Sequence, residues 1–597
     1  MPNPDSSFKM RDRPMAVSRC FDFLQGKGQG KGLGNVRRSL LMRILGFGSA
    51  VASSLMVAVA IAPTVSAANS IRAHYGPIQL SISVESLERF ADEGVINPDL
   101  QAYANRLSDQ ELVEVRRLLQ SSADVDPVAI ANFLYTAQGE AILERVGGVI
   151  RTRSSSGFYA LRAALILAAS HEDGATPLGL LKEFPTDSIV IDVDRGLKIV
   201  RELDQLINVT SEALSLVETQ FNKDVANING ISLRPAYELS RLGPYLWEQT
   251  TLPLQDKTRD RDLPLDLYLP NVDAPAPLVV ISHGLGSDRT SYRYVAEHLA
   301  SRGFAVAALD HPGSNANYIQ ALFEGASEQI SEPEEFINRP RDISFVLDEL
   351  TRLAATDAAF RNRMNLDQVG VIGQSFGGFT ALSIAGAEIN LERLQRDCPS
   401  GSALQDTLNL SLLLQCRARN LNPADLPDPI SLKDDRVKAA LAINPISSIV
   451  FGSEGMAGVD VPVMIVSGSS DVIAPSLMEQ LFPFAWLNVS DRYLVVMRKG
   501  THFSTIGLPD DPANSVELPP AIIGPDPALA QTYTKILSTA FFSTHVAEQP
   551  AYQEYLSPSY IRAISREPLP LSIVESLNAE QLTQMVKDTS LLISILD

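Results

Sequence analysis

Cysteine is scarce in this chain, with only three among 597 residues. Cys20 precedes the apolar run described below, and neither Cys398 nor Cys416 lies at the spacing of a metal-ligand motif. Seventeen residues separate Cys398 from Cys416. In an exported protein such a pair predicts a disulfide, worth about 3 kcal/mol in the chain-entropy description. The alternative is a pair of buried free thiols.

Positive charge is also in short supply, because 50 Lys and Arg face 70 Asp and Glu, for a net charge of −20. Residues 1–68 hold nine of the basic and three of the acidic residues, so the rest of the chain carries −26. An acidic body argues against binding to nucleic acid and against electrostatic docking on anionic membranes. We therefore expect neither partner.

The basic stretch precedes an apolar run, Ile44–Ala62, which is followed by Pro63 and the small-x-small signal Val65-Ser-Ala67. This order predicts a secretory signal peptide over residues 1–68, cleaved near Ala67, which leaves no stable membrane span and places the mature protein in the periplasm or outside the cell. The alternative is an uncleaved membrane anchor, since the run is nearly long enough to span a bilayer. Whether Arg37-Arg38 marks twin-arginine export or only adds charge to a Sec signal stays open.

Residues 69–242 carry helical signals and no catalytic signature. Ser108-Asp-Gln-Glu111 is a capping box, and Asp126-Pro127 places a proline at the first position of a helix. The alternating run Ile78–Val84 and the short stretch Ser188–Val193 indicate two strands. We predict a mainly helical domain of unknown function.

From residue 243 to about 550 the pattern changes to a hairpin, then to strands that alternate with helices. The expected strands are Trp247–Leu254, Leu263–Leu269, Pro277–His283, Phe304–Asp310, Val369–Gly373, Val437–Ala442, Val461–Ser467 and Tyr493–Met497. This alternation predicts an α/β fold with a doubly wound, mostly parallel sheet. Insertions at 312–341 and 390–432 are expected to cover the site, and residues 551–597 to form a C-terminal helical tail.

The segment Gly373-Gln-Ser-Phe-Gly377 follows one of these strands and precedes a helix. A serine on such a strand-to-helix turn exposes its hydroxyl for attack on a carbonyl, so Ser375 is the candidate nucleophile. The five-residue pattern alone is weak, and its context carries the prediction.

Histidine is scarce too, with seven in the chain, and a serine nucleophile needs one as its base. In sheets of this kind serine, acid and histidine follow in that order, which leaves His502 and His545. His502 lies on a loop after a strand, whereas His545 lies in an apparently helical stretch, so we assign the base to His502. Of the other histidines, we expect His283 to be structural and His298 to lie on a helix surface.

Asp471 is the candidate acid, because it follows a strand and precedes His502 by one helix and one strand. The oxyanion formed in the attack needs two N–H donors, which we assign to the backbone amides of Phe376 and Leu285. His311 lies near the expected mouth of the pocket and has no assigned role.

These segments resemble the α/β-hydrolase fold, and within it the platelet-activating-factor acetylhydrolases and the dienelactone-hydrolase-like esterases. The motifs are the strand Leu263–Leu269, Ser282-His-Gly-Leu-Gly286, Leu309-Asp-His-Pro-Gly-Ser314, Arg341-Asp342 and Gly373-Gln-Ser-Phe-Gly-Gly378. The resemblance spans about residues 243–545. Residues 72–220 resemble the helical domain of unknown function that precedes such hydrolases in exported, largely cyanobacterial proteins.

The resemblance implies carboxylic-ester hydrolysis by Ser375, Asp471 and His502, with Leu285 and Phe376 as oxyanion donors and with no metal or cofactor. Two features depart from the pattern. Gln374 stands where acetylhydrolases usually carry histidine, and the nucleophile is serine where dienelactone hydrolases use cysteine.

We therefore expect a secreted serine esterase that forms an acyl-enzyme on a small-molecule or lipid ester, including phospholipid acyl esters. A lipase or phospholipase is the nearest enzymatic alternative, and a peptidase is a more distant one. A non-catalytic binding scaffold with a hydrolase fold is the alternative from another class. The helical region could also be a lid or a partner-docking domain, and the sequence leaves the oligomeric state open.

Overall fold

The computed structural model describes residues 67–75, 78–123, 125–171, 174–227, 238–398, 407–422, 427–507 and 520–587. Apart from its last two residues, the expected signal peptide lies outside the described residues, as do Cys20 and Arg37-Arg38. No helix in the described part of the chain is long and apolar enough to cross a membrane.

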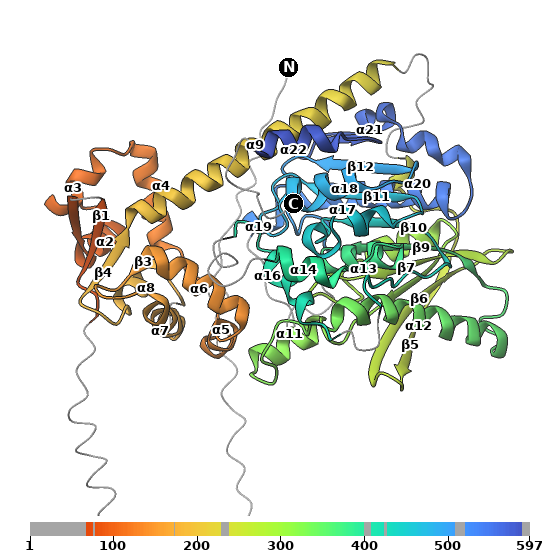
Figure 1. Cartoon of the computed structure of the whole chain (residues 1–597), viewed down its shortest axis with the longest axis horizontal. Coiled ribbons are helices and arrows are strands. Elements are labelled where there is room, and N and C mark those ends of the chain that lie inside the picture. Colours follow the sequence, from red (N-terminus) through yellow and green to blue (C-terminus); the bar gives the residue numbers. More distant parts are fainter. Residues whose placement is uncertain are drawn as a thin grey trace, which may run out of the picture. The chain divides into compact units, whose positions relative to one another are not determined.

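The first part of the described chain combines a small sheet with short helices (Figure 1). Its four strands lie in the order β2-β1-β4-β3, namely Ile78–Ser83, Ser70–Tyr75, Ser188–Asp192 and Ile150–Arg151. The helices are α2 Val84–Glu93, α3 Pro98–Ala104, α4 Asp109–Gln120, α5 Pro127–Leu134, α6 Ala137–Val149, α7 Phe158–Ala169 and α8 Pro177–Lys182. The region is mainly helical, and β1 is a strand that the sequence patterns did not indicate.

Local capping signals fix where these helices begin. The Ser108 side chain accepts from the Glu111 amide while the Glu111 carboxylate accepts from the Ser108 amide, so the predicted capping box is confirmed. Asp126 accepts from the amides of Val128 and Ala129 ahead of Pro127, which confirms the second predicted helix start.

Helix α9, Val193–Asn227, packs in the core of the domain that follows it and not in the core of the small sheet. The buried residues of the small sheet and its helices, such as Leu143 and Phe184, form one apolar cluster. The buried face of α9 instead joins the large core of the following domain, through Leu206, Val209, Ala213, Val217 and Phe221. In packing terms the division therefore falls just before α9 rather than at residue 242.

The second part is built on nine strands in the order β13-β12-β11-β10-β9-β7-β8-β6-β5. The central strands from β8 to β12 run parallel, and β5, β6 and β13 are antiparallel to their neighbours. The strands are β5 Trp247–Asp256, β6 Arg261–Pro270, β7 Ala276–Ser282, β8 Ala305–Leu309, β9 Met364–Gln374, β10 Val437–Ile443, β11 Val463–Gly468, β12 Arg492–Met497 and β13 Leu571–Val574. The predicted doubly wound, mostly parallel sheet is confirmed.

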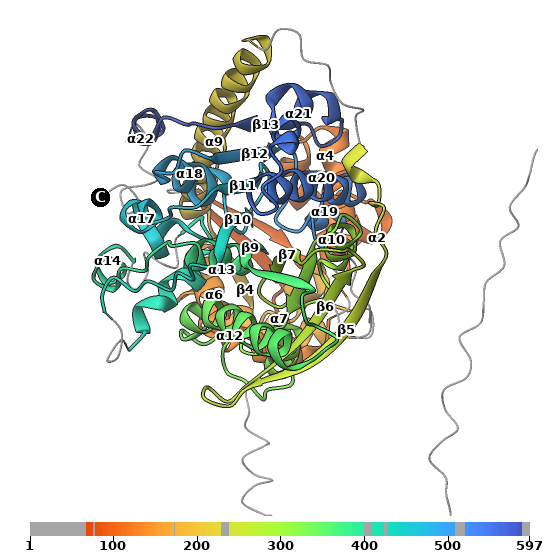
Figure 2. The ribbon, with the colours of Figure 1, turned by 90° about the vertical axis from the view of Figure 1, so that its right-hand side faces the viewer.

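Helices cover both faces of this sheet. Figure 2 shows α10 (Arg293–Ser301) and α20 (Pro527–His545) on one side, and α12 (Glu335–Thr356) and α13 (Phe376–Ile384) on the other. The remaining helices are α11 Ala316–Phe323, α14 Leu391–Asp397, α16 Leu412–Gln415, α17 Ser448–Ala457, α18 Phe482–Trp486, α19 Pro520–Ile523, α21 Pro558–Ile564 and α22 Ala579–Lys587, with a π-helix over Leu477–Leu481. Strand residues such as Val280, Val371 and Leu441 are buried because helices lie on both sides of them.

The C-terminal segment corrects one expectation. Residues 551–597 were expected to form a helical tail, but β13 pairs with β12 and completes the edge of the main sheet. Its residues Leu571 and Ile573 are buried in the large core. Residues Leu571–Val574 are therefore part of the main sheet.

Candidate active site

Ser375 lies on a strained turn between β9, which ends at Gln374, and α13, which begins at Phe376. Its backbone has a φ of 55° and a ψ of −116°, an unusual conformation for a residue other than glycine. A Cβ at Gly373 would lie 2.0 Å from the carbonyl oxygen of Gly377, and one at Gly377 would lie 2.0 Å from that of Ser282. Both glycines are therefore needed for strand and helix to pass this closely.

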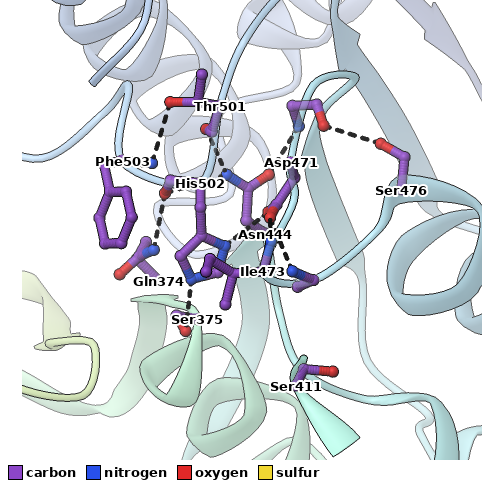
Figure 3. Close-up of polar contacts among 12 residues, drawn as sticks. Gln374, Ser375, Ser411, Asn444, Asp471, Ile473, Ser476, Thr501, His502 and Phe503 are labelled. Carbon is purple, nitrogen blue, oxygen red and sulfur yellow. Dashed lines mark hydrogen bonds and ion pairs between the residues drawn. The ribbon is translucent and has the colours of Figure 1, made fainter. Parts of the chain in front are cut away.

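The structure brings Ser375, Asp471 and His502 together (Figure 3). The Oγ of Ser375 lies 2.9 Å from Nε2 of His502, and Nδ1 of His502 lies 2.6 Å from Oδ2 of Asp471. All three residues are buried, with Ser375 9% exposed. A carboxylate can only accept hydrogen bonds, so Nδ1 carries the proton and Nε2 is free to accept the serine hydroxyl proton.

The loop after β11 fixes the acid. Oδ1 of Asp471 accepts from the amides of Ile473 and Ala474 at 2.9 and 2.8 Å, while Oδ2 faces the histidine. One carboxylate oxygen thus holds its own loop and the other holds the imidazole.

The expected oxyanion donors lie on two segments that pack together. Phe376 is the first residue of α13, so its N–H has no partner within the helix. Leu285 lies on the loop after β7, which contacts the serine turn: a Cβ at Gly284 would lie 2.3 Å from Oε1 of Gln374. Neighbouring Gly286 has a φ of +72°, which a residue with a side chain would rarely adopt.

A buried arginine supports this arrangement, and sequence reasoning missed it. Arg339 is fully buried and donates to the hydroxyls of Thr380 and Ser314 at 3.0 and 2.6 Å, and to the carbonyl of His283. Its guanidinium also lies 4.6 Å from the ring centroid of Phe376. Burial lowers the pKa of Arg339 to about 9. Arg339 therefore ties the loop that bears Leu285 to the helix that begins at Phe376.

His283 and His311 belong to the same buried network and not to the triad. The amide of His311 donates to Nε2 of His283 at 2.9 Å, and Nδ1 of His311 lies 2.9 Å from Oδ2 of Asp342. Burial holds the pKa of both imidazoles well below the ordinary value, with the charge of Arg339 acting in the same direction. His283 is structural, as predicted, and His311 is fully buried rather than at a pocket mouth.

His298 and His545 lie apart from the triad. His298 was expected on a helix surface, but it is only 1% exposed on α10, so that expectation is wrong. The sequence pattern did not indicate the burial of His298, because a single histidine on the inner face of a helix leaves the period of the apolar residues unchanged. His545 is the last residue of α20, in agreement with its expected helical setting.

The predicted disulfide is present: Cys398 and Cys416 are bonded, with a Cα–Cα distance of 5.6 Å. Among the described residues there is no group of three or more His, Cys, Asp or Glu side chains that could hold a metal ion.

The fold and this serine turn are those of an α/β hydrolase, and the family comparison agrees: residues 277–396 match the family described as alpha/beta hydrolase fold. Residues 67–192 match a second family, described as alpha/beta hydrolase of unknown function (DUF1400). The predicted family is confirmed by both matches.

Three curated relatives carry the name platelet-activating factor acetylhydrolase. The protein of Canis lupus familiaris is 31% identical over 137 residues, which are 18% of this chain and 31% of that protein. The protein of Bos taurus is 28% identical over 137 residues, with the same two shares. That of Gallus gallus is 44% identical over 59 residues, which are 10% of this chain and 13% of that protein. The matches thus span less than a third of the length of these relatives.

Proposed function

We propose that this protein is a serine hydrolase that cleaves carboxylic esters through an acyl-enzyme, with Ser375 as nucleophile, His502 as base and Asp471 as the acid that orients the base. The observation that carries the proposal is the pair of hydrogen bonds at 2.9 and 2.6 Å that connects serine to imidazole and imidazole to carboxylate. A serine hydroxyl is a weak nucleophile until a base in contact with it accepts its proton.

The proposed reaction uses the three residues in turn. As Oγ of Ser375 bonds to the ester carbon, its proton passes to Nε2 of His502, and Asp471 stabilises the imidazolium that forms. The carbonyl oxygen becomes an oxyanion, for which the amides of Leu285 and Phe376 are the proposed donors. When the intermediate collapses, the C–O bond to the alcohol breaks and His502 returns the proton to the leaving oxygen. Water then attacks the acyl-enzyme with the same proton transfers in turn, which releases the acid and restores Ser375.

The substrate class rests on chemistry and on likeness. Hydrolysis of an ester needs no more than the groups described above, and the named relatives act on an acetyl ester by their printed name. We propose small-molecule or lipid esters as substrates, with phospholipid acyl esters as the first class to examine. Gln374 differs from the histidine usual in acetylhydrolases, so chain-length preference has to be measured and not carried over.

We also propose that the mature protein is exported after cleavage near Ala67. The disulfide between Cys398 and Cys416 supports this, because disulfides persist in oxidising compartments such as the periplasm and the cell exterior.

The test is a panel of acyl esters of graded chain length, with the parent protein and Ser375→Ala compared at matched concentration. We expect the parent to hydrolyse part of the panel and the variant to lose kcat by about 10³-fold or more, because the variant lacks the hydroxyl whose proton His502 accepts. A variant that hydrolyses the esters as fast as the parent would refute the mechanism. A parent that hydrolyses none of them would favour the binding scaffold.

A further inference from the structure

The catalytic histidine stands on a loop whose position no regular ladder fixes. His502 comes five residues after the end of β12, and its imidazole must meet Ser375 on one side and Asp471 on the other. No main-chain N–H of the described residues donates to the carbonyl oxygen of His502. Something other than secondary structure must therefore hold this residue.

Two side-chain amides donate to that carbonyl (Figure 3). Nε2 of Gln374 lies 3.0 Å from the carbonyl oxygen of His502, and Nδ2 of Asn444 lies 3.4 Å from it and 3.1 Å from that of Thr501. Both amides are 2% exposed, so these hydrogen bonds do not compete with water.

Gln374 and Asn444 stand at the ends of neighbouring strands of the main sheet. Gln374 is the last residue of β9 and directly precedes Ser375. Asn444 directly follows β10, and its Oδ1 accepts from the amide of Gly468 at 2.7 Å, three residues before Asp471. A displacement of the histidine loop would therefore break its contacts with the neighbour of Ser375 and with Asn444, which is itself bonded to the end of the strand that leads to Asp471.

We propose that Gln374 and Asn444 act as an amide clamp: positioning residues that hold the main chain of His502 at the distance where its imidazole meets both Ser375 and Asp471. The proposal rests on the proposed hydrolase function of this site. It also gives a role to the position before the nucleophile, where the residue must be a hydrogen-bond donor that reaches the histidine carbonyl.

The surroundings of Gln374 select this orientation of its amide. A Cβ at Gly284 would lie 2.3 Å from Oε1 of Gln374, so the amide oxygen packs against the loop that bears Leu285 while the amide nitrogen faces His502. Gln374 thus spaces the oxyanion loop from the histidine loop. A glutamate of the same shape could not serve, because an ionised carboxylate cannot donate to a carbonyl.

The backbone of Asn444 fits the same role. It has a φ of 42°, a left-handed conformation that asparagine tolerates better than most residues. The main-chain N–H of Asn444 donates to the carbonyl of Val466 at 2.8 Å, so the residue is held between β10 and β11.

The test replaces the Gln374 donor while keeping the length of the side chain, as Gln374→Met. The matched control is Gln480→Met, because Gln480 is equally buried and donates to the backbone carbonyls of Pro445 and Ala474 at 3.0 and 3.2 Å, but not to His502. We expect both variants to lower the melting temperature to a similar degree. Gln374→Met should lower kcat about 10- to 100-fold with KM within about threefold, while Gln480→Met keeps kcat within about threefold.

A second readout needs no substrate. The proton between Nδ1 of His502 and Asp471 should give a far-downfield proton resonance in the parent, and we expect it to broaden or move in Gln374→Met but not in Gln480→Met. If Gln374→Met does not fold, Asn444→Gly, which keeps the left-handed conformation, takes its place and should show the same losses.

The outcomes separate the clamp from the hydrolase proposal. If the parent turns over no ester but Gln374→Met still loses the resonance, the function is wrong and the clamp stands. If the parent is active and the variant keeps both the parent kcat and its resonance, the clamp is wrong and the function stands. Equal losses of kcat in the Gln374 and Gln480 variants would also overturn the clamp, because they would reflect general loosening.

Discussion

Three residues far apart in sequence meet at this site because each one lies just after a strand of the same sheet. Ser375 follows β9, Asp471 follows β11 and His502 follows β12, and parallel strands end at the same edge. Their order along the chain was enough to predict them from sequence. The supporting residues were not predictable in this way, because Asn444 and Arg339 act through contacts with carbonyls that only the folded chain brings near.

His298 carries a residue-scale prediction about acid stability. Burial lowers the pKa of His298 from 6.5 to about 3, and the charges of Arg302 and Lys535 act in the same direction. Below pH 6.5 the unfolded chain takes up a proton at this histidine and the folded chain does not, so acid favours unfolding. The contribution of neutral His298 to stability is complete above its pKa in the unfolded chain. It is lost as the pH falls toward its pKa in the folded chain.

We therefore expect His298→Leu to lose less stability than the parent between about pH 7 and about pH 4, by roughly 3 kcal/mol. Urea unfolding of both proteins at these two pH values measures the difference. Parallel losses in parent and variant would contradict the buried, neutral state of His298.

At the scale of elements, the central strands were easy to predict because both of their faces are buried. The edge strands were more difficult. The apolar runs of β7, β9 and β11 have the composition of strands covered by helices. Strand β13 has only four residues, Leu571–Val574, and a run that short cannot be distinguished from part of a helix by its period. Its role became visible only through its pairing with β12.

The insertion that holds the disulfide is tied to the acid loop by a buried carboxylate. Glu479 is fully buried in the π-helix and accepts from the side chains of Asn409 and Gln415 and from the amides of Ser447 and Ser448. In addition, the amide of Ser411 donates to the carbonyl of Ile473 at 2.9 Å. The insertion is thus a fixed neighbour of the loop that bears Asp471.

At the scale of the whole molecule, α9 decides where the chain can be divided. Five of its buried residues pack in the core of the hydrolase part, and Arg498 pairs with Glu218 at 2.8 Å. The small sheet and its helices, residues 67–192, have a core of their own. The sequence predicted the domain boundary at residue 242 because helical signals end there. The sequence does not indicate which core a helix joins.

Two truncations test this division. A chain that starts at Val193 retains α9, whereas one that starts at Glu238 uncovers the part of the core that α9 covers. We expect the shorter chain to be less stable by more than about 5 kcal/mol, since several large apolar side chains are removed at once. Thermal and urea unfolding of both chains give the comparison, and equal stability would contradict the assignment of α9 to the hydrolase core.

The most direct test of the account is to treat the protein with a fluorophosphonate and to locate the label by peptide mapping. We predict stoichiometric labelling of Ser375, with labelling slowed by about 10³-fold or more in His502→Ala, because the hydroxyl is then without its base. Labelling at another residue, or equal rates in the parent and in His502→Ala, would contradict the claim that Ser375, His502 and Asp471 act as one catalytic unit.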